Sequence, residues 1–224
     1  LDHTDRGRLG AGAVATEAQL GGNVVELGGA DAPLVAPAPL TRPAARSFRE
    51  EQATANALTW RITRIPVLLI LGWMTASHLL LESQWVFIDN VNLLLHEAGH
   101  VIFSWGGDQL AALGGTIGQL MWPAIFAGYF WWRRRERFAA VAAVWWFGEN
   151  LVGIARYLQD GPRESLPLIG GNVHDWNFLL SRWGLLSKAD EIAGAVRFGG
   201  AAIMVVSLGL LVLWTVRPSP RELD

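Results

Sequence analysis

A five-residue segment, His96-Glu97-Ala98-Gly99-His100, carries the residues best suited to chemistry in this chain. On an α-helix, His96 and His100 lie four residues apart and share a face, so both imidazoles can bind one zinc ion. Glu97 stands beside the first histidine, where a carboxylate can accept a proton from a water molecule at the metal. The segment therefore predicts a zinc centre with His96 and His100 as ligands and Glu97 as general base.

A catalytic zinc site needs a third protein ligand and one open position for water. The later segment Asn172-Val173-His174-Asp175-Trp176 places a histidine beside a carboxylate. His174 or Asp175 is therefore the expected third ligand, with Asp160 as a further candidate. The alternative is that Asp175 only caps a helix expected from Trp176 to Leu186.

The polar face of the expected motif helix extends beyond the two histidines. Asp89, Asn92, His96 and His100 follow one another in steps of three, four and four residues, which places them on one stripe. Metal-bound histidines usually donate their second ring nitrogen to a carboxylate or carbonyl, so Asp89 or Asn92 is expected to support them. The alternative is a coincidental match on a helix whose histidines simply pack against neighbours. Ionisable residues are costly in an apolar segment, and this favours the metal site.

The composition indicates an integral membrane protein. Hydrophobic residues make up 51% of the 224 residues, and the mean hydropathy is +0.27. Residues 67–81, 109–132 and 198–216 contain no Asp, Glu, Lys or Arg. The last two runs are long enough to cross a hydrocarbon core of about 30 Å. Twelve tryptophans, several near expected span ends, are typical of aromatic belts at membrane surfaces.

The predicted fold is all-α, a polytopic membrane helical bundle of about five segments. The segments are expected near residues 62–81, 85–105, 109–132, 138–158 and 192–216. The second segment, which holds the motif, would also fit a re-entrant placement. Glycines between residues 106 and 118 favour either a re-entrant loop beside the site or close helix packing through small residues. Pro123 is expected to kink the third segment.

The fourth expected segment carries its own polar residues. Glu149 and Arg156 lie seven residues apart on one face and can pair with each other. Alternatively, Glu149 or Asn150 faces the metal site, and Glu149 then becomes another candidate for the third ligand.

Three regions are expected along the chain. Residues 1–58, rich in Ala, Gly and Pro, predict a flexible extramembrane arm with a short helix near residues 48–58. Residues 59–217 form the membrane-embedded core, and residues 218–224 a short tail. The basic cluster at residues 133–137 follows an apolar run directly, so it indicates lipid headgroups rather than nucleic acid as its partner. The absence of cysteine excludes disulfides, iron–sulfur clusters and a thiol nucleophile.

With its His-Glu-x-x-His segment inside an apolar helix, the chain resembles the site-2 protease family of intramembrane zinc metalloproteases. It looks most like small bacterial members without a PDZ domain, and the resemblance covers residues 62–216. The resemblance implies a membrane-embedded helical core, zinc bound by His96, His100 and a later aspartate, and Glu97 as general base. The family's Asp-Gly pair is matched in letters by Asp160-Gly161, whereas Asp175 comes later and lacks the glycine.

The expected function is zinc-dependent hydrolysis of peptide bonds in membrane-protein substrates, in the bacterial inner membrane. A transmembrane helix that unwinds locally is the expected substrate, because a helical peptide bond is hydrogen-bonded and shielded. One alternative is a catalytically inactive member that serves as a structural or accessory subunit of a larger membrane complex. Another is a tetrapyrrole bound through His78, His96 or His100, which would leave Glu97 without a role.

Overall fold

The computed structural model describes residues 42–81, 85–169 and 173–216. The chain divides into two units, residues 1–44 and 45–224. Most of the predicted arm and the whole of the predicted tail therefore lie outside the described residues. The described part of the arm region, from Arg42 onward, is helical and continuous with the first long helix.

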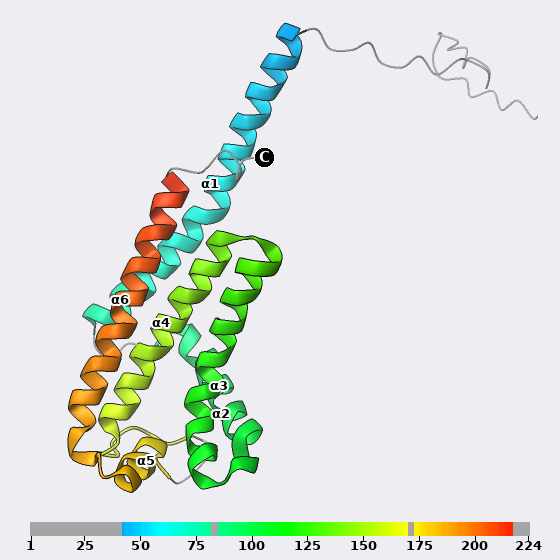
Figure 1. The fold of residues 1–224 in the computed structure, drawn as a ribbon. Coiled ribbons are helices and arrows are strands. Elements are labelled where there is room, and N and C mark those ends of the chain that lie inside the picture. The colour runs from blue at the N-terminus through cyan, green and yellow to red at the C-terminus, as the bar shows by residue number, and fades with distance from the viewer. Residues whose placement is uncertain (1–41, 82–84, 170–172, 217–224) are drawn as a thin grey trace, which may run out of the picture. The chain divides into compact units, whose positions relative to one another are not determined.

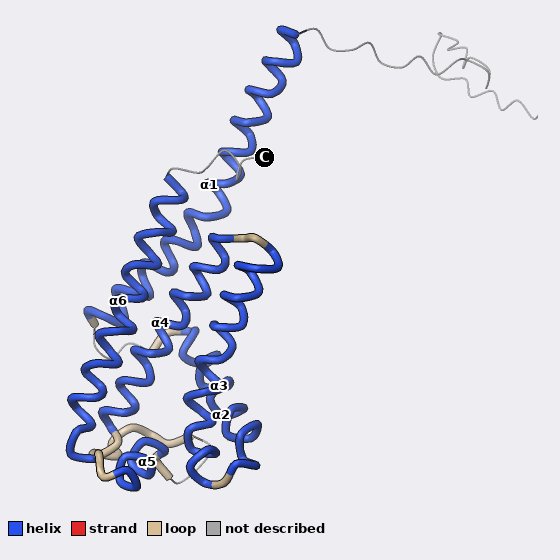
Figure 2. The backbone as a smooth tube through the Cα atoms, in the orientation of Figure 1, coloured by secondary structure: helices blue, strands red, loops and turns tan. Residues whose placement is uncertain are grey.

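The described residues are helical with short connections, and they contain no strand (Figure 2). The prediction of an all-α fold is confirmed. The α-helices are α1 (Arg42–Leu80), α2 (Phe87–Phe103), α3 (Asp108–Gly128), α4 (Arg137–Asp160), α5 (Asp175–Trp183) and α6 (Ala189–Val216). Three shorter elements connect them, namely the 3-10 helices η1 (Ser104–Gly106) and η3 (Leu186–Lys188) and the π-helix η2 (Tyr129–Arg134).

Four helical segments of the described chain are long and apolar enough to cross a membrane. They are Thr54–Leu80, Asp108–Arg134, Arg137–Asp160 and Leu186–Val216. The motif helix α2 is not among them; its 17 residues span only about 25 Å at 1.5 Å per residue. A count of five spans is therefore not reached in the described residues, and a re-entrant placement of α2 stays a prediction.

Helix α4 is the central helix of the bundle formed by residues 45–224. In its most apolar 18-residue stretch, 61% of the residues are buried inside the protein, against 33% or less in the other three candidate spans. It packs along α6 on one side and against α3 on the other, and α3 in turn packs along α2 (Figure 1). Its fully buried Trp145 packs with Met204 of α6, and this contact forms part of the apolar core.

Helices α2 and α3 approach each other through glycines. A Cβ atom on Gly114 would lie 2.6 Å from the carbonyl oxygen of Gly99, and one on Gly118 would lie 2.6 Å from the carbonyl oxygen of Leu95. No side chain fits at either position, so the two backbones are in direct contact. Of the two predictions for this glycine-rich stretch, close helix packing is the one observed. Helix α3 continues through Pro123 and passes into η2.

Candidate metal centre

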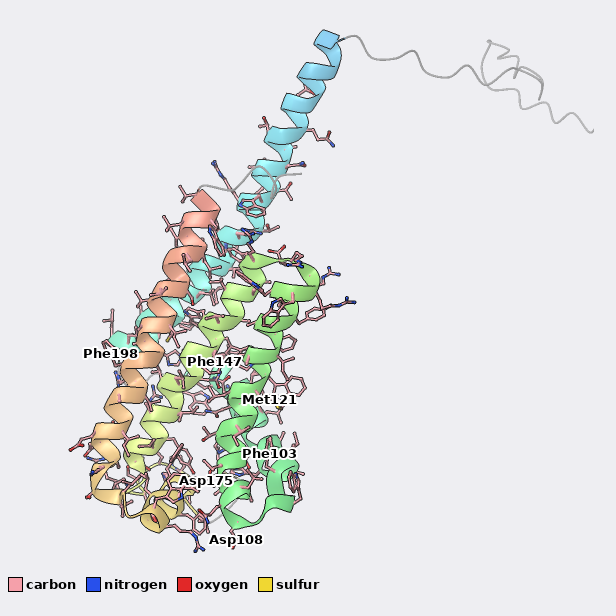
Figure 3. The ribbon with its side chains drawn as sticks, viewed as in Figure 1. Phe103, Asp108, Met121, Phe147, Asp175 and Phe198 are labelled. Carbon is pink, nitrogen blue, oxygen red and sulfur yellow. The ribbon has the colours of Figure 1, made fainter. Side chains whose placement is uncertain are left out.

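The two motif histidines of α2 and the first residue of α5 meet at one point. His96 Nε2 lies 3.2 Å and His100 Nε2 lies 3.3 Å from the same oxygen, Oδ2 of Asp175. One ligand atom from each residue lies within 4.8 Å of the others. Figure 3 marks Asp175 at the start of α5. Two imidazoles and one carboxylate form a donor set of the kind that catalytic zinc sites use, with a fourth position open.

The second nitrogen of each imidazole ring has an acceptor. His96 Nδ1 lies 3.2 Å from Oε1 of Gln119, and His100 Nδ1 lies 2.7 Å from the carbonyl oxygen of Ala111. Because carbonyl oxygens only accept hydrogen bonds, both Nδ1 atoms carry hydrogens. Each Nε2 is then the nitrogen available to a metal ion, and both rings are fixed in orientation.

The three residues also attract each other electrostatically. The hydrogen bond from His100 to Asp175 raises the pKa of His100 to about 9. Burial alone would raise the pKa of Asp175, but the hydrogen bonds from His100 and His96 outweigh burial and lower it to about 2. The carboxylate is thus ionised at neutral pH and offers its charge to a cation, which must displace the proton of His100 to bind.

Gly115 of α3 keeps clear the space in front of the ligand nitrogens. A Cβ atom there would lie 2.7 Å from His100 Nε2, and it would also collide with the ring of His96. The backbone of α3 thus passes beside the centre without filling it. Together with the fixed ring orientations, this clearance makes the three residues a good fit for a bound metal ion.

The structure does not bring His174 to this centre. Its Nδ1 accepts a hydrogen bond of 3.3 Å from the backbone N–H of Asn177, so that His174 caps α5 in place of Asp175. Its Nε2 lies 3.4 Å from Oδ2 of Asp160, and Asp160 also accepts hydrogen bonds from the backbone of residues 165–166. His174 and Asp160 therefore lie beside each other at the two ends of the loop between α4 and α5, and of the three candidates only Asp175 meets the motif histidines.

The other polar residues of the predicted stripe belong to a separate group. Asn92 donates a hydrogen bond of 2.8 Å to Oε2 of Glu149, and Asp89 accepts one of 2.6 Å from the backbone N–H of Val86. The prediction that Asp89 or Asn92 supports the metal-binding histidines is wrong, because α3 supplies those partners. The predicted Glu149–Arg156 pair is also not among the ion pairs of the described residues, and Glu149 groups with His78 and Asp89 rather than with the motif histidines.

A cavity of about 680 Å³ opens in front of the centre. Its lining includes the half-buried Glu97, which makes no hydrogen bond to any described residue. Tyr157 also lines the cavity, and its hydroxyl donates a hydrogen bond of 3.3 Å to Oδ2 of Asp175. The volume suits a short peptide segment or a small ligand.

Sequence analysis missed four contributors to this site: Gln119, Tyr157, Gly115 and the carbonyl of Ala111. One of them could have been found, because Gln119 is a polar side chain in a run without charges and lies one helical turn after Gly115. The carbonyl of Ala111 could not have been found, because every residue has a backbone carbonyl and the sequence does not show which one accepts a hydrogen bond from a side chain.

Comparisons of the chain with protein-family models, with curated proteins and with solved structures found no match. What the described residues define is an all-helical protein with four helices that could cross a membrane and a partly buried His-His-Asp group beside a cavity.

Proposed function

We propose that the chain is a zinc metalloprotease of the bacterial inner membrane that hydrolyses peptide bonds in membrane-protein substrates. The observation that supports this most strongly is the convergence of His96, His100 and Asp175 at one point, beside a cavity that Glu97 also lines. The resemblance of the motif to the site-2 protease family points to the same activity.

Each residue around the centre has a separate role in such a hydrolysis. A zinc ion held by the three ligands would supply Lewis-acid activation of water and of the carbonyl under attack. Glu97 accepts the proton of the attacking water and passes it to the leaving amine. Tyr157 holds the Asp175 carboxylate in place through its hydrogen bond.

The proposal is tested by replacing the general base. Glu97→Gln keeps the size of the side chain but cannot accept a proton, so we expect cleavage to fall by about 10²–10⁴-fold while zinc stays bound. The full chain is reconstituted in liposomes with a set of single-span transmembrane peptides, and products are detected by mass spectrometry. Cleavage by the variant at the wild-type rate would contradict the assignment. Absence of cleavage by the wild type, with zinc present, would favour an accessory subunit.

A further inference from the structure

A second group of potential metal ligands lies buried where α1, α2 and α4 meet. His78, Asp89 and Glu149 each offer one ligand atom, and these atoms lie within 4.8 Å of one another. The exposed fractions of the three residues are 1%, 8% and 0%. None of them takes part in the centre formed by the motif histidines.

Several atoms of this group have no hydrogen-bond partner among the described residues. They are both ring nitrogens of His78 and Oε1 of Glu149, and all three are buried. His78 Nε2 lies 3.3 Å from that same Glu149 oxygen, without the geometry of a hydrogen bond. Buried polar groups are normally paired, and unpaired ones usually mark a ligand or a functional role.

The acidic side chains of the group also suit a cation. Two ionised carboxylates in a buried position would repel each other and lose the solvation that water gives them, so each needs a proton or a cation beside it. Arg156 contributes positive charge from the cavity side, but it forms no ion pair with either carboxylate among the described residues. A divalent cation between the two carboxylates would balance their charge.

We propose that His78, Asp89 and Glu149 form a second metal site that binds one divalent ion of the zinc class. One imidazole nitrogen and two carboxylate oxygens are ligands that zinc and its first-row neighbours accept. The supporting contacts are present as well: Asn92 holds the second oxygen of Glu149 at 2.8 Å, and the Val86 N–H holds Asp89 at 2.6 Å. Such contacts orient carboxylate ligands in known metal sites.

The second site is separate from the motif centre. On α2, Asp89 precedes His96 by seven residues, a rise of about 10 Å along the helix. Two-metal catalytic sites hold their ions about 3.5–4 Å apart, so the second ion does not share a water or substrate with the first. The cavity in front of the motif centre is also lined by Asp89, and it gives the ion a route into the protein.

The position of the site assigns the ion a structural task. Its three ligands come from three different helices, so a bound ion ties α1 to α2 and α4. Near His78, the described residues also link α1 to α4 through the hydrogen bond of 2.9 Å from Trp145 Nε1 to Thr75 Oγ1.

The test counts zinc ions per chain by elemental analysis of the full-length protein, purified in detergent without chelator. With both sites filled, the wild type holds two zinc ions per chain. The His96→Ala/His100→Ala double variant keeps one, and it binds added Co²⁺ with the visible absorption of a site with nitrogen and oxygen ligands. Glu149→Gln, which preserves side-chain size, also keeps one.

Thr75→Val is the matched control, because it removes the Trp145–Thr75 hydrogen bond between α1 and α4 and should leave two zinc ions bound. The proposal is overturned if Glu149→Gln leaves the zinc content of the wild type unchanged, or if the folded double variant binds neither Zn²⁺ nor Co²⁺. Failure of the proposed protease centre looks different: the wild type would then hold one zinc ion that is lost in Glu149→Gln and kept in the double variant.

Discussion

Each histidine of the motif centre is oriented by a hydrogen-bond acceptor on the neighbouring helix α3. This acceptor fixes the position of the ring hydrogen, orients the ring toward the metal and makes the other ring nitrogen a better metal ligand. For His96 this acceptor is the side-chain amide of the buried Gln119. The Gln119 side chain can be replaced by mutation, whereas the backbone carbonyl of Ala111 that accepts from His100 cannot. The effect of the acceptor on zinc affinity can therefore be measured at Gln119.

Gln119→Leu should weaken zinc binding at the motif centre by about 10–100-fold, because the ring of His96 loses its acceptor. The fold should persist, since leucine is close to glutamine in size and the site is buried in an apolar helix. Affinity is measured by competition with a chromophoric chelator.

Gln109→Leu is the matched control on the same helix. Gln109 accepts a hydrogen bond of 3.1 Å from Trp183 Nε1 at an exposed position, so its loss should not change zinc affinity. Equal affinities for the wild type and Gln119→Leu would show that the amide does not orient the ligand.

At this scale, the sequence allowed prediction of residues that share one helix. The spacing of His96 and His100 predicts their common face, and the structure brings both to Asp175, one of the two leading candidates for third ligand. The sequence alone could not decide between His174 and Asp175 as third ligand, because the choice depends on which of the two residues caps α5. The misassigned role of Asp89 has a similar cause: a stripe on one helix does not say which neighbouring helix faces each turn.

The contact between α2 and α3 decides whether the motif centre has room for an ion. The glycines of α3 bring its backbone against α2, and Gly115 is the one placed opposite the ligand nitrogens. Close packing and metal binding thus depend on the same absence of side chains.

Gly115→Ala should abolish zinc binding at the motif centre while leaving the protein helical. The added methyl group would lie 2.7 Å from His100 Nε2, in the space that the metal needs, whereas alanine favours a helix more than glycine does. Zinc content and far-ultraviolet circular dichroism measure the two effects.

Gly194→Ala provides the comparison, since a Cβ atom at this position of α6 meets nothing within 4 Å. It should keep its zinc and gain up to about 1 kcal/mol of stability. If Gly115→Ala kept the same zinc content as Gly194→Ala, the described geometry of the centre would be wrong.

Element positions were largely predictable. Apolar runs located α4 and α6 to within a few residues, because long uncharged stretches leave few alternatives to a helix. A short helix near residues 48–58 was predicted, but not that it continues into α1 and begins at Arg42. The π-helical turn after α3 was not predicted either, since neither feature depends on hydropathy.

At the scale of the whole described bundle, the apolar surface agrees with a membrane protein. Large apolar side chains such as Leu69, Trp73 and Val206 are 60–69% exposed on the candidate spans. Apolar surface of this extent is normally covered by lipid or by another protein. The sequence predicted this property from composition alone, whereas the number of spans depended on the length of α2.

Val206→Arg should impair membrane insertion, because it places a charge on the exposed face of α6, at a cost of about 2.5–3.5 kcal/mol at mid-span. Trp105→Arg, an exposed position in η1 outside the four candidate spans, should insert normally. The membrane-bound fraction after alkaline extraction is the measurement. Equal insertion of both variants would contradict the assignment of α6 as a lipid-facing span.

The most direct test of the motif centre is the zinc content of Asp175→Ala, because this residue joins the two histidines from another helix, and its other side-chain partner, Tyr157, lines the same cavity. Elemental analysis of the purified full chain should find one zinc ion fewer per chain than in the wild type. Asp190→Ala, which removes an exposed aspartate paired with Arg163 at 3.2 Å, should retain the wild-type content. An Asp175→Ala protein with as much zinc as the wild type would contradict a centre built from His96, His100 and Asp175.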